Sequence, residues 1–275
     1  MRRWHLTHSS VYEFPEASWV GPHQIRLRPQ ADRSCQHRLR LWPEPDVGHW
    51  ALDSWNNQVF RAWYARPLRR LVISNQLEYE PRTLNPFHFV LDSRALSVPP
   101  QLPAIPAFAE LEPGGAEFQR WLEPWKSYQG EVLPFLTTLN QGVHQAVGYQ
   151  VRHQPGVLTG EELLQIGRGS CRDLSWLLIQ TLRHLGFSAR FVSGYWLQLP
   201  ETPRAVQQAE LHAWVEVYLE GAGWLGLDPT AGLVVAQHHI PLARGARPEH
   251  TLPLEGSHSA ACARSEFRLC LRRIP

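Results

Sequence analysis

The sequence lacks the long apolar runs that membrane helices and secretion signals require. No stretch approaches the roughly 20 apolar residues of a membrane-spanning helix. Residues 1–14 include two arginines near the start, but no apolar segment follows them, as it would in a secretory signal. We therefore expect a cytoplasmic protein that does not bind membranes.

Strong charge of either sign is also missing. Lys and Arg together number 27 and Asp and Glu number 25, which gives a formal net charge of only +2. No basic run with interleaved aromatic residues occurs, so we expect no nucleic acid among the partners. Hydrophobic residues make up 43% of the 275 residues and charged residues 19%, which is enough apolar content for a packed core and argues against general disorder.

Cysteine is scarce, and its spacing is not that of a metal site. The four cysteines are Cys35, Cys171, Cys262 and Cys270. In a cytoplasmic chain of this length we expect thiols instead of a disulfide scaffold. His238 and His239 could be combined with Cys262 or Cys270 into a zinc site, but no C-x-x-C or H-x-x-x-H spacing supports it, and no acidic calcium loop occurs. The sequence therefore predicts no metal and no other cofactor.

The patterns that are present divide the chain into two regions. Residues 1–98 are predicted to be β-rich, because short alternating runs recur there between Pro, Gly and Asn residues. Residues 53–57 are predicted to form a hairpin turn within this region. Prolines cluster after residue 98, so residues 99–115 are predicted to be a linker. Residues 116–275 then form the predicted catalytic core.

Helical signals open the core. Leucines and valines recur at spacings of three and four within residues 116–147. Thr159 and Glu162 fit a capping box that begins a short helix ending at Ile166. A further amphipathic run begins at Cys171, and a glycine at position 186 stands where a C-terminal cap belongs. Cys171 is therefore predicted at or just before the first turn of a helix whose apolar face is buried.

Strand patterns follow this helix. They cover residues 189–197 and residues 211–219, and the second run alternates so that His212 lies on its polar face. A glycine-rich turn leads to a returning strand at residues 224–228, which Pro229 ends. Together these patterns predict an α+β fold in which the helix that begins with cysteine packs against an antiparallel sheet.

A thiol at the N-terminus of a helix is a candidate nucleophile, because unpaired N–H groups and the helix dipole favour the thiolate. The same N–H groups can receive the oxyanion that forms when Cys171 attacks a carbonyl. His212 is the candidate base, and Asp228 is the candidate group that orients the imidazole and stabilises its charged form. Asp228 reaches His212 only if the turn before residue 224 has an odd number of residues or a bulge, which sets Asp228 diagonal to His212 across the strands.

Four motifs carry these residues in order along the chain. They are Gly169-Ser-Cys171-Arg-Asp173, Leu182-Arg-His-Leu-Gly186-Phe-Ser-Ala-Arg190-Phe-Val-Ser-Gly194-Tyr, His212-Ala-Trp-Val-Glu216 and Gly223-Trp-Leu-Gly-Leu-Asp228-Pro-Thr. On these motifs, residues 167–230 resemble the bacterial transglutaminase-like superfamily, and the first hundred residues are similar to the β-rich N-terminal region of that family. The resemblance implies a papain-like core with Cys171, His212 and Asp228 as nucleophile, base and orienting acid. It also implies that an amide is attacked, that ammonia or an amine leaves, and that water or another amine resolves a thioester.

The chain departs from the family pattern at three places. Trp176 stands where many relatives place a histidine, and Ala231 replaces the usual asparagine after Asp-Pro-Thr. Residues 243–253 follow the family pattern only loosely, with His250 in place of an aspartate. That segment is a candidate border of the active site, so substrate preference stays open.

Each candidate residue also has an ordinary structural interpretation. Cys171 could be a small buried hydrophobe, His212 a structural strand residue and Asp228 a turn residue before proline. Asp173 is assigned to the helix start through the dipole, and Glu216 to a supporting or exposed pair; neither is assigned to catalysis.

Three functions fit the sequence. The first is a cysteine peptidase or amidase that hydrolyses a peptide or another amide-containing substrate, and we prefer it because no device for excluding water or recognising an amine is evident. The second is a protein-glutamine transamidase, and the third is a scaffold that has kept the fold without activity, against which the intact triad argues. The second oxyanion donor is left open between candidates such as Tyr149 and Gln150, and the oligomeric state is open as well.

Overall fold

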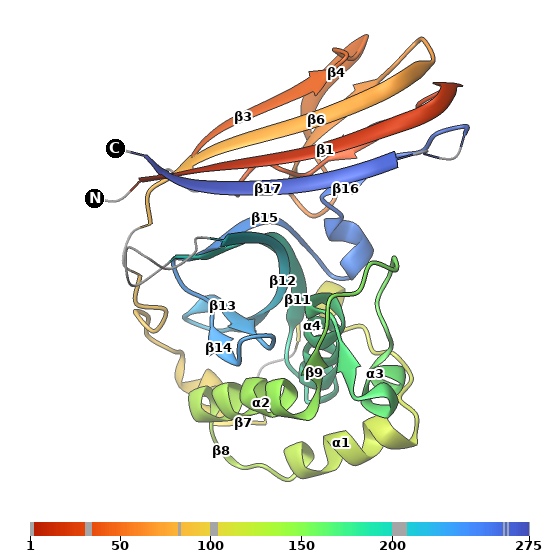
Figure 1. Ribbon diagram of the computed structural model, residues 1–275. Coiled ribbons are helices and arrows are strands. Elements are labelled where there is room, and N and C mark those ends of the chain that lie inside the picture. The colour runs from red at the N-terminus through yellow and green to blue at the C-terminus, as the bar shows by residue number, and fades with distance from the viewer. Residues whose placement is uncertain are drawn as a thin grey trace.

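The chain folds as an α+β protein in which a β-rich region is stacked on a mixed core (Figure 1). The computed structural model describes residues 3–30, 35–81, 84–99, 104–199, 208–260, 262 and 264–274. The two chain ends lie close together on the β-rich region, since Arg3 pairs with Ile274 (Figure 1). Across these described stretches, no helix combines the length and the apolar character needed to cross a membrane.

The β-rich region consists of two antiparallel sheets. The first has the order β17 (Arg264–Ile274), β1 (Arg3–Ser18), β6 (Leu68–Tyr79) and β3 (Cys35–Trp42). The second has the order β16 (Leu254–Glu255), β2 (His23–Ile25), β5 (Gln58–Trp63) and β4 (Val47–Leu52). Burial alternates along β6, where Leu71, Ile73 and Leu77 are inside, because successive side chains of a strand point to opposite faces. The predicted β-rich N-terminal region is confirmed.

The last strand returns to the first sheet instead of staying with the core. β17 pairs with β1, and β16 pairs with β2. On the sequence alone, both strands are grouped with residues 116–275, because no local pattern tells a strand of one sheet from a strand of another. As domain boundaries, the limits at residues 98 and 115 stay a prediction, but the strand pairing joins residues 254–255 and 264–274 to the β-rich region.

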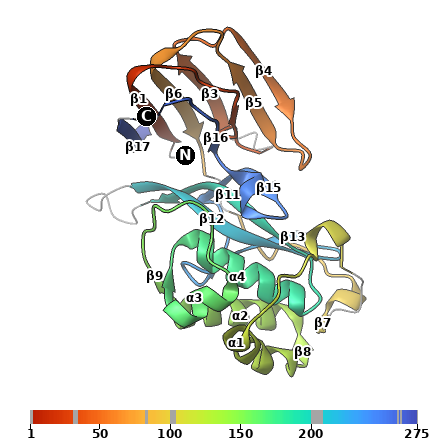
Figure 2. The same cartoon turned by 90° about the vertical axis from the view of Figure 1, so that its right-hand side faces the viewer.

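The core is an antiparallel sheet covered by helices on the side away from the β-rich region (Figure 2). Its strand order is β14 (Leu233–Val234), β13 (Gly223–Asp228), β12 (Gln208–Leu219), β11 (Ala189–Gln198) and β15 (His239–Gly245). The helices are α1 (Ala116–Lys126), α2 (Val132–Ala146), α3 (Gly160–Ile166) and α4 (Cys171–His184). The short elements are η1 (Ser93–Ala95), β7 (Ser97–Val98), η2 (Pro106–Phe108), β8 (Gly130–Glu131), β9 (Gly148–Tyr149), β10 (Arg168–Gly169) and η3 (Pro248–Thr251).

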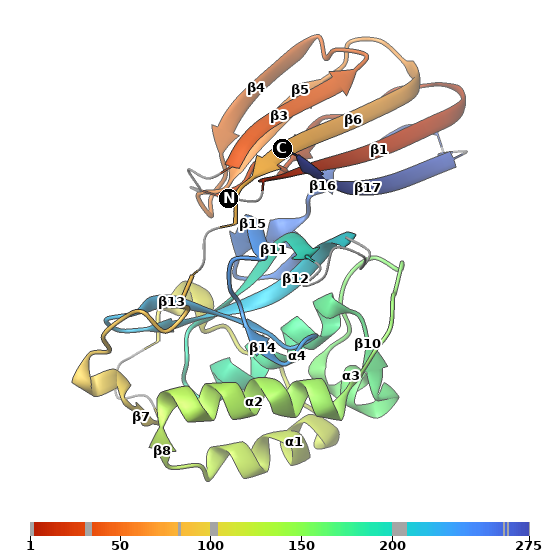
Figure 3. The same cartoon turned by 60° about the vertical axis from the view of Figure 1, so that its left-hand side comes forward.

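The helix signals of the sequence are confirmed. α3 begins with the predicted capping box, in which the Thr159 Oγ1 accepts from the N–H of Glu162 and the Glu162 carboxylate accepts from the N–H of Thr159. Gly186 follows α4 with a φ of +87°, a left-handed conformation that suits glycine at the end of a helix. The helical pattern of residues 116–147 is two helices, α1 and α2, which lie side by side (Figure 3). They are separate because β8 lies between them and pairs with β7.

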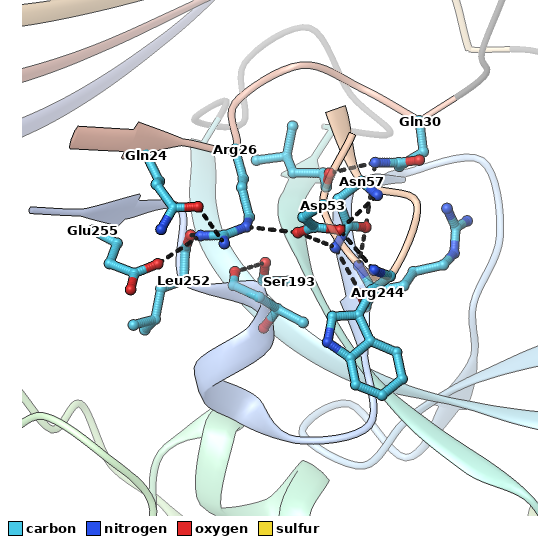
Figure 4. Close-up of polar contacts among 12 residues, drawn as sticks. Gln24, Arg26, Gln30, Asp53, Asn57, Ser193, Arg244, Leu252 and Glu255 are labelled. Atoms are coloured by element: carbon cyan, nitrogen blue, oxygen red, sulfur yellow. Dashed lines mark hydrogen bonds and ion pairs between the residues drawn. The ribbon is translucent and has the colours of Figure 1, made fainter. Parts of the chain in front are cut away.

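A buried polar network joins the β-rich region to the core sheet (Figure 4). The carboxylate of Asp53 accepts hydrogen bonds from Arg26 Nε and from Asn57 Nδ2, each over 3.1 Å. It also accepts from the N–H groups of Trp55 and Asn57, which closes the predicted turn. Asn57 in turn donates from Nδ2 to the carbonyl of Arg244 on β15 and accepts at Oδ1 from its N–H, each over 2.8 Å. The Arg26 and Asp53 side chains are only 6% and 10% exposed, so the two buried charges depend on each other.

Removing the Asp53 carboxylate should therefore destabilise the whole protein. In Asp53→Ala, Arg26 keeps its hydrogen bonds to the Leu252 carbonyl and the Gln24 side chain, but its remaining ion pair is with the half-exposed Glu255. We therefore expect the free energy of unfolding to fall by about 3 kcal/mol. Glu13→Gln is the control, because it removes an exposed ion pair with Arg70 and should change stability by less than about 1 kcal/mol. Urea unfolding followed by tryptophan fluorescence measures both. Equal, small effects in the two variants would contradict the role given to the network.

Candidate active site

The N-terminus of α4 carries the predicted nucleophile. Cys171 is the first residue of this helix, and its side chain is partly buried. Ser170 precedes it, and the Asp173 carboxylate accepts hydrogen bonds from the Ser170 N–H over 2.8 Å and from its Oγ over 2.6 Å. Asp173 also forms an ion pair with Arg152 at 2.8 Å. The predicted place of Asp173 at the helix start is confirmed, and its contacts fix the backbone that presents the Cys171 thiol.

The strand that returns after β12 brings Asp228 to His212. The pairing of β12 with β13 begins at Leu219 and Gly223, so residues 220–222 form the turn. This turn has the odd length that the sequence analysis requires, and even positions therefore oppose even positions. His212 Nε2 donates to Asp228 Oδ2 over 2.9 Å, and the two side chains are 1% and 0% exposed. The predicted register is confirmed.

Burial and hydrogen bonding act in opposite directions on this pair. Burial by itself would lower the pKa of His212, but its interactions with Asp228 and Cys171 outweigh burial and raise the pKa to about 10. Burial would likewise raise the pKa of Asp228, but hydrogen bonds from His212 and His239 hold it well below its usual range. Both shifts favour an imidazolium beside a carboxylate at neutral pH.

The second ring nitrogen of His212 is the one that remains for the thiol. Asp228 occupies Nε2, whereas Nδ1 is buried and has no hydrogen bond to any described residue. The Cys171 thiol lies close enough to contribute to the raised pKa of the His212 ring. The structure thus brings the three predicted site residues together, with the imidazole between the thiol and the carboxylate.

A second histidine, which is not in the predicted set, contacts the same carboxylate. His239 Nε2 donates to Asp228 Oδ2 over 3.0 Å. The other oxygen, Oδ1, accepts from the N–H groups of Thr230 over 2.9 Å and Ala231 over 3.4 Å. β12 and β11 separate β13 from β15 in the sheet, and the strong curvature of the sheet brings Asp228 and His239 together (Figure 1). From its place in the sequence, His239 is a candidate only for a zinc site, because no local pattern ties it to Asp228.

Two tryptophans enclose the histidines. The ring centroid of Trp196 lies 5.0 Å from that of His212 and 6.0 Å from that of His239. Trp214, which is buried, lies 6.4 Å from His212 and 5.2 Å from His239. These aromatic rings pack against the two imidazoles, and an aromatic face can stabilise a neighbouring imidazolium.

The two candidates for the second oxyanion donor, Tyr149 and Gln150, lie next to the residues that precede Cys171. β9 and β10 run parallel, and β10 ends two residues before Cys171. Tyr149, at the end of β9, is 48% exposed, and partial burial together with the nearby Cys171 raises the pKa of its hydroxyl. The N–H of Gln150 donates to the carbonyl of Gly169 over 2.8 Å. Their assignment as the second oxyanion donor stays a prediction.

Other residues named in the sequence analysis have contacts of their own. Glu216 forms ion pairs with Arg190 at 2.5 Å and with Arg244 at 3.0 Å, in keeping with a supporting role. Trp176 donates from Nε1 to the Glu112 carboxylate over 2.9 Å.

The loosely matching segment, residues 243–253, also meets Trp176. The Arg247 guanidinium lies 5.7 Å from the Trp176 ring centroid and 3.4 Å from Glu112. Residues 243–245 of this segment belong to β15, and that strand begins with His239, which does contact the site. The expectation that residues 243–253 border the active site stays a prediction.

One group of residues in the site has a composition that metals favour. His212, Asp228 and His239 each offer one ligand atom, and these atoms all lie within 4.8 Å of one another. In the structure, the Nε2 atoms of His212 and His239 each donate a hydrogen bond to Asp228. A cation bound at these atoms would have to displace the proton from each of them. That the protein works without a metal or another cofactor stays a prediction.

Two regions of the chain match family models of known proteins. Residues 128–229 match the transglutaminase-like superfamily, and residues 4–80 match the bacterial transglutaminase-like N-terminal region. A crystal structure from Cytophaga hutchinsonii, of a protein named as a proposed cysteine protease, has a TM-score of 0.69 at 15% identity. The match covers 98% of this chain and 90% of that one, which confirms the predicted α+β fold with a transglutaminase-like, papain-like core.

Relatives among curated proteins match in part. An uncharacterised protein of Mycobacterium leprae is 30% identical over 104 residues, which are 37% of this chain and 36% of that protein. An uncharacterised protein of Mycobacterium tuberculosis is 37% identical over 101 residues, which are 34% of this chain and 32% of that protein. The chain therefore spans about a third of the length of these curated relatives. With both family regions present in order, this chain joins a bacterial transglutaminase-like N-terminal region to a core of the transglutaminase-like superfamily.

Proposed function

We propose that the protein is a thiol-dependent amide hydrolase, a cysteine peptidase or amidase, in which Cys171, His212 and Asp228 form a catalytic triad. The observation that carries this proposal is the buried His212–Asp228 pair, whose remaining ring nitrogen lies near a thiol at the N-terminus of a helix. A buried charged pair contributes little net stability compared with apolar packing, so its presence beside a cysteine supports a chemical role.

The chemistry follows from the order of the three groups. The Cys171 thiolate attacks the carbonyl carbon of an amide, and the first N–H groups of α4 receive the oxyanion. The imidazolium of His212 donates its Nδ1 proton to the leaving nitrogen, which departs as ammonia or an amine and leaves a thioester on sulfur. Neutral His212 then takes a proton from water, the hydroxide attacks the thioester carbonyl, and the acid product leaves as the thiolate re-forms. Asp228 stays ionised and holds the ring throughout.

The thioester could also be resolved by an amine, which would make the protein a protein-glutamine transamidase. Hydrolysis is preferred because no device for excluding water or recognising an amine is evident in the sequence. The third candidate, a scaffold without activity, would not need a thiol, an imidazole and a carboxylate in this order. A peptide or another amide-containing compound as substrate, no nucleic acid or membrane as partner, and a cytoplasmic location stay predictions.

The first test is the reactivity of Cys171 with iodoacetamide. A free thiol with a pKa of about 8.5 is almost fully protonated at pH 6, so rapid alkylation at that pH requires a neighbouring cation such as the His212 imidazolium. We expect Cys171 to react at least tenfold faster than the exposed Cys270, and His212→Ala to remove this advantage. Peptide mass spectrometry follows each cysteine separately. If Cys171 reacts like Cys270 and is indifferent to His212→Ala, the scaffold becomes the better function.

Replacement of the nucleophile should separate catalysis from folding. Because the Cys171 side chain is only partly buried, Cys171→Ala should abolish turnover while it changes the free energy of unfolding by less than about 1 kcal/mol. Activity is followed as new amino termini or released ammonia from denatured protein substrates, and stability by urea unfolding. Cys270→Ala is the matched control and should retain full activity. Loss of folding in Cys171→Ala would show that the thiol belongs to the core instead.

The fate of the thioester distinguishes hydrolysis from transamidation. In the presence of a fluorescent primary amine, a hydrolase should release ammonia or new amino termini with little label transferred to the protein substrate, because water outcompetes the amine. Label transfer and product release are measured in one reaction, with Cys171→Ala as the blank. Transfer of label at a rate comparable to product release would establish the transamidase instead.

A further inference from the structure

The Asp228 carboxylate serves two histidines through one oxygen. Oδ2 accepts from His212 Nε2 at 2.9 Å and from His239 Nε2 at 3.0 Å. The backbone N–H groups of Thr230 and Ala231 already hold the other oxygen. The turn therefore restrains the carboxylate without help from His239, and the second histidine is an additional donor on the oxygen that faces the triad.

The surroundings of His239 fix this donation. Its side chain is 8% exposed, and its Nδ1 is buried without a hydrogen bond to the described part of the chain. A proton on Nδ1 would therefore be a buried donor without an acceptor, whereas a proton on Nε2 has Asp228. The ring stacks on Trp196 with an interplanar angle of 16°, and its backbone N–H donates to the carbonyl of Ala236 over 3.1 Å. The ring is thus held with its Nε2–H aimed at Oδ2.

Two donors on one carboxylate oxygen compete with each other. Each hydrogen bond draws electron density from the carboxylate, so the bond from His239 weakens the attraction that Asp228 exerts on the His212 proton. A general acid works best when it can release its proton near the working pH. Without the hydrogen bond from His239, Asp228 would make His212 more basic, and His212 would protonate the leaving nitrogen more slowly.

We propose that His239 is a positioning residue that acts through Asp228: its Nε2–H occupies Oδ2 and moderates the basicity of His212. This inference deepens the proposed function and rests on it where it concerns proton transfer to the leaving group. The hydrogen-bond arrangement itself exists whether or not the protein turns over a substrate, which allows the two claims to be tested apart.

Other titratable groups lie around the site. They are Cys171 on α4, Tyr149 on β9, Glu210 on β12 and His238 beside β15. His238 supplies the matched control, since it adjoins His239 in sequence and makes no hydrogen bond to Asp228 among the described contacts. Cys171 is replaced by alanine in every sample, so that the titration of the thiol does not overlap that of the ring.

The experiment is a titration of the His212 ring by NMR with ring-15N histidine, in the full chain carrying Cys171→Ala. His239→Leu removes the donor, His239→Gln keeps a donor that can reach a carboxylate, and His238→Leu is the control. We expect His239→Leu to raise the pKa of His212 by roughly half to one unit, because Asp228 then acts on one histidine alone. His239→Gln and His238→Leu should leave it within about 0.3 unit of the parent.

Three outcomes would overturn the proposal: an unchanged or lowered pKa of His212 in His239→Leu, equal shifts in His239→Leu and His239→Gln, or an equal shift in His238→Leu. A merely structural role for His239 would lower stability without this pattern. If His239→Leu does not fold, His239→Asn takes its place, because its shorter side chain withdraws the donor from Asp228. Failure of the proposed function is detected in a different experiment, the alkylation of the protein that retains Cys171: the thiol would then react no faster than that of Cys270. That result would not change the outcome of the titration.

Discussion

A carboxylate that is fully buried must be surrounded by donors, and the core sheet is built around that requirement at Asp228. Its side chain is 0% exposed and accepts four hydrogen bonds, from two histidine rings and from the N–H groups of the turn that follows β13. An isolated buried charge would cost several kcal/mol, so the loss of any one donor would destabilise the whole site. The donors come from β12, from β15 and from the Asp-Pro-Thr turn. Satisfying one charge therefore fixes three strands relative to one another, and the orientation of His212 is a direct result.

A second buried carboxylate does the same for the nucleophile. Asp173 is also fully buried, and it accepts from Ser170 and from the N–H of Leu158 while Arg152 balances its charge. Burial alone would raise the pKa of Asp173, but these hydrogen bonds outweigh it and lower the pKa, so the group stays ionised at neutral pH. Its charge also lies at the positive end of the dipole of α4. One carboxylate thus places the helix that carries the thiol, the other places the imidazole, and the site forms where the two meet.

Local patterns were enough to predict much of this site, and long-range pairing accounts for the rest. The capping box of α3, the place of Cys171 at a helix start and the odd turn before Asp228 all follow from neighbouring residues, because helix and hairpin geometry are local. His239 could not be assigned in this way, since β15 reaches Asp228 only through the curvature of a sheet in which two strands separate them. The return of β17 to β1 was missed for the same reason: its sequence alternates as any strand does, and its partner lies at the opposite end of the chain.

β15 is one of the strands through which the two regions of the chain become one structure. At its start it supplies His239 to Asp228, and further along, its Pro241 and Leu242 carbonyls accept from the backbone and side chain of Gln30 over 2.9 Å and 3.0 Å. Beyond these, its Arg244 backbone is held by Asn57 of the Arg26–Asp53 network. β15 is an edge strand of the core sheet, with β11 on one side only, so its second edge would otherwise be free to shift. The β-rich region restrains that strand from the outside, and the same restraint keeps the His239 ring within hydrogen-bonding distance of the carboxylate that orients His212.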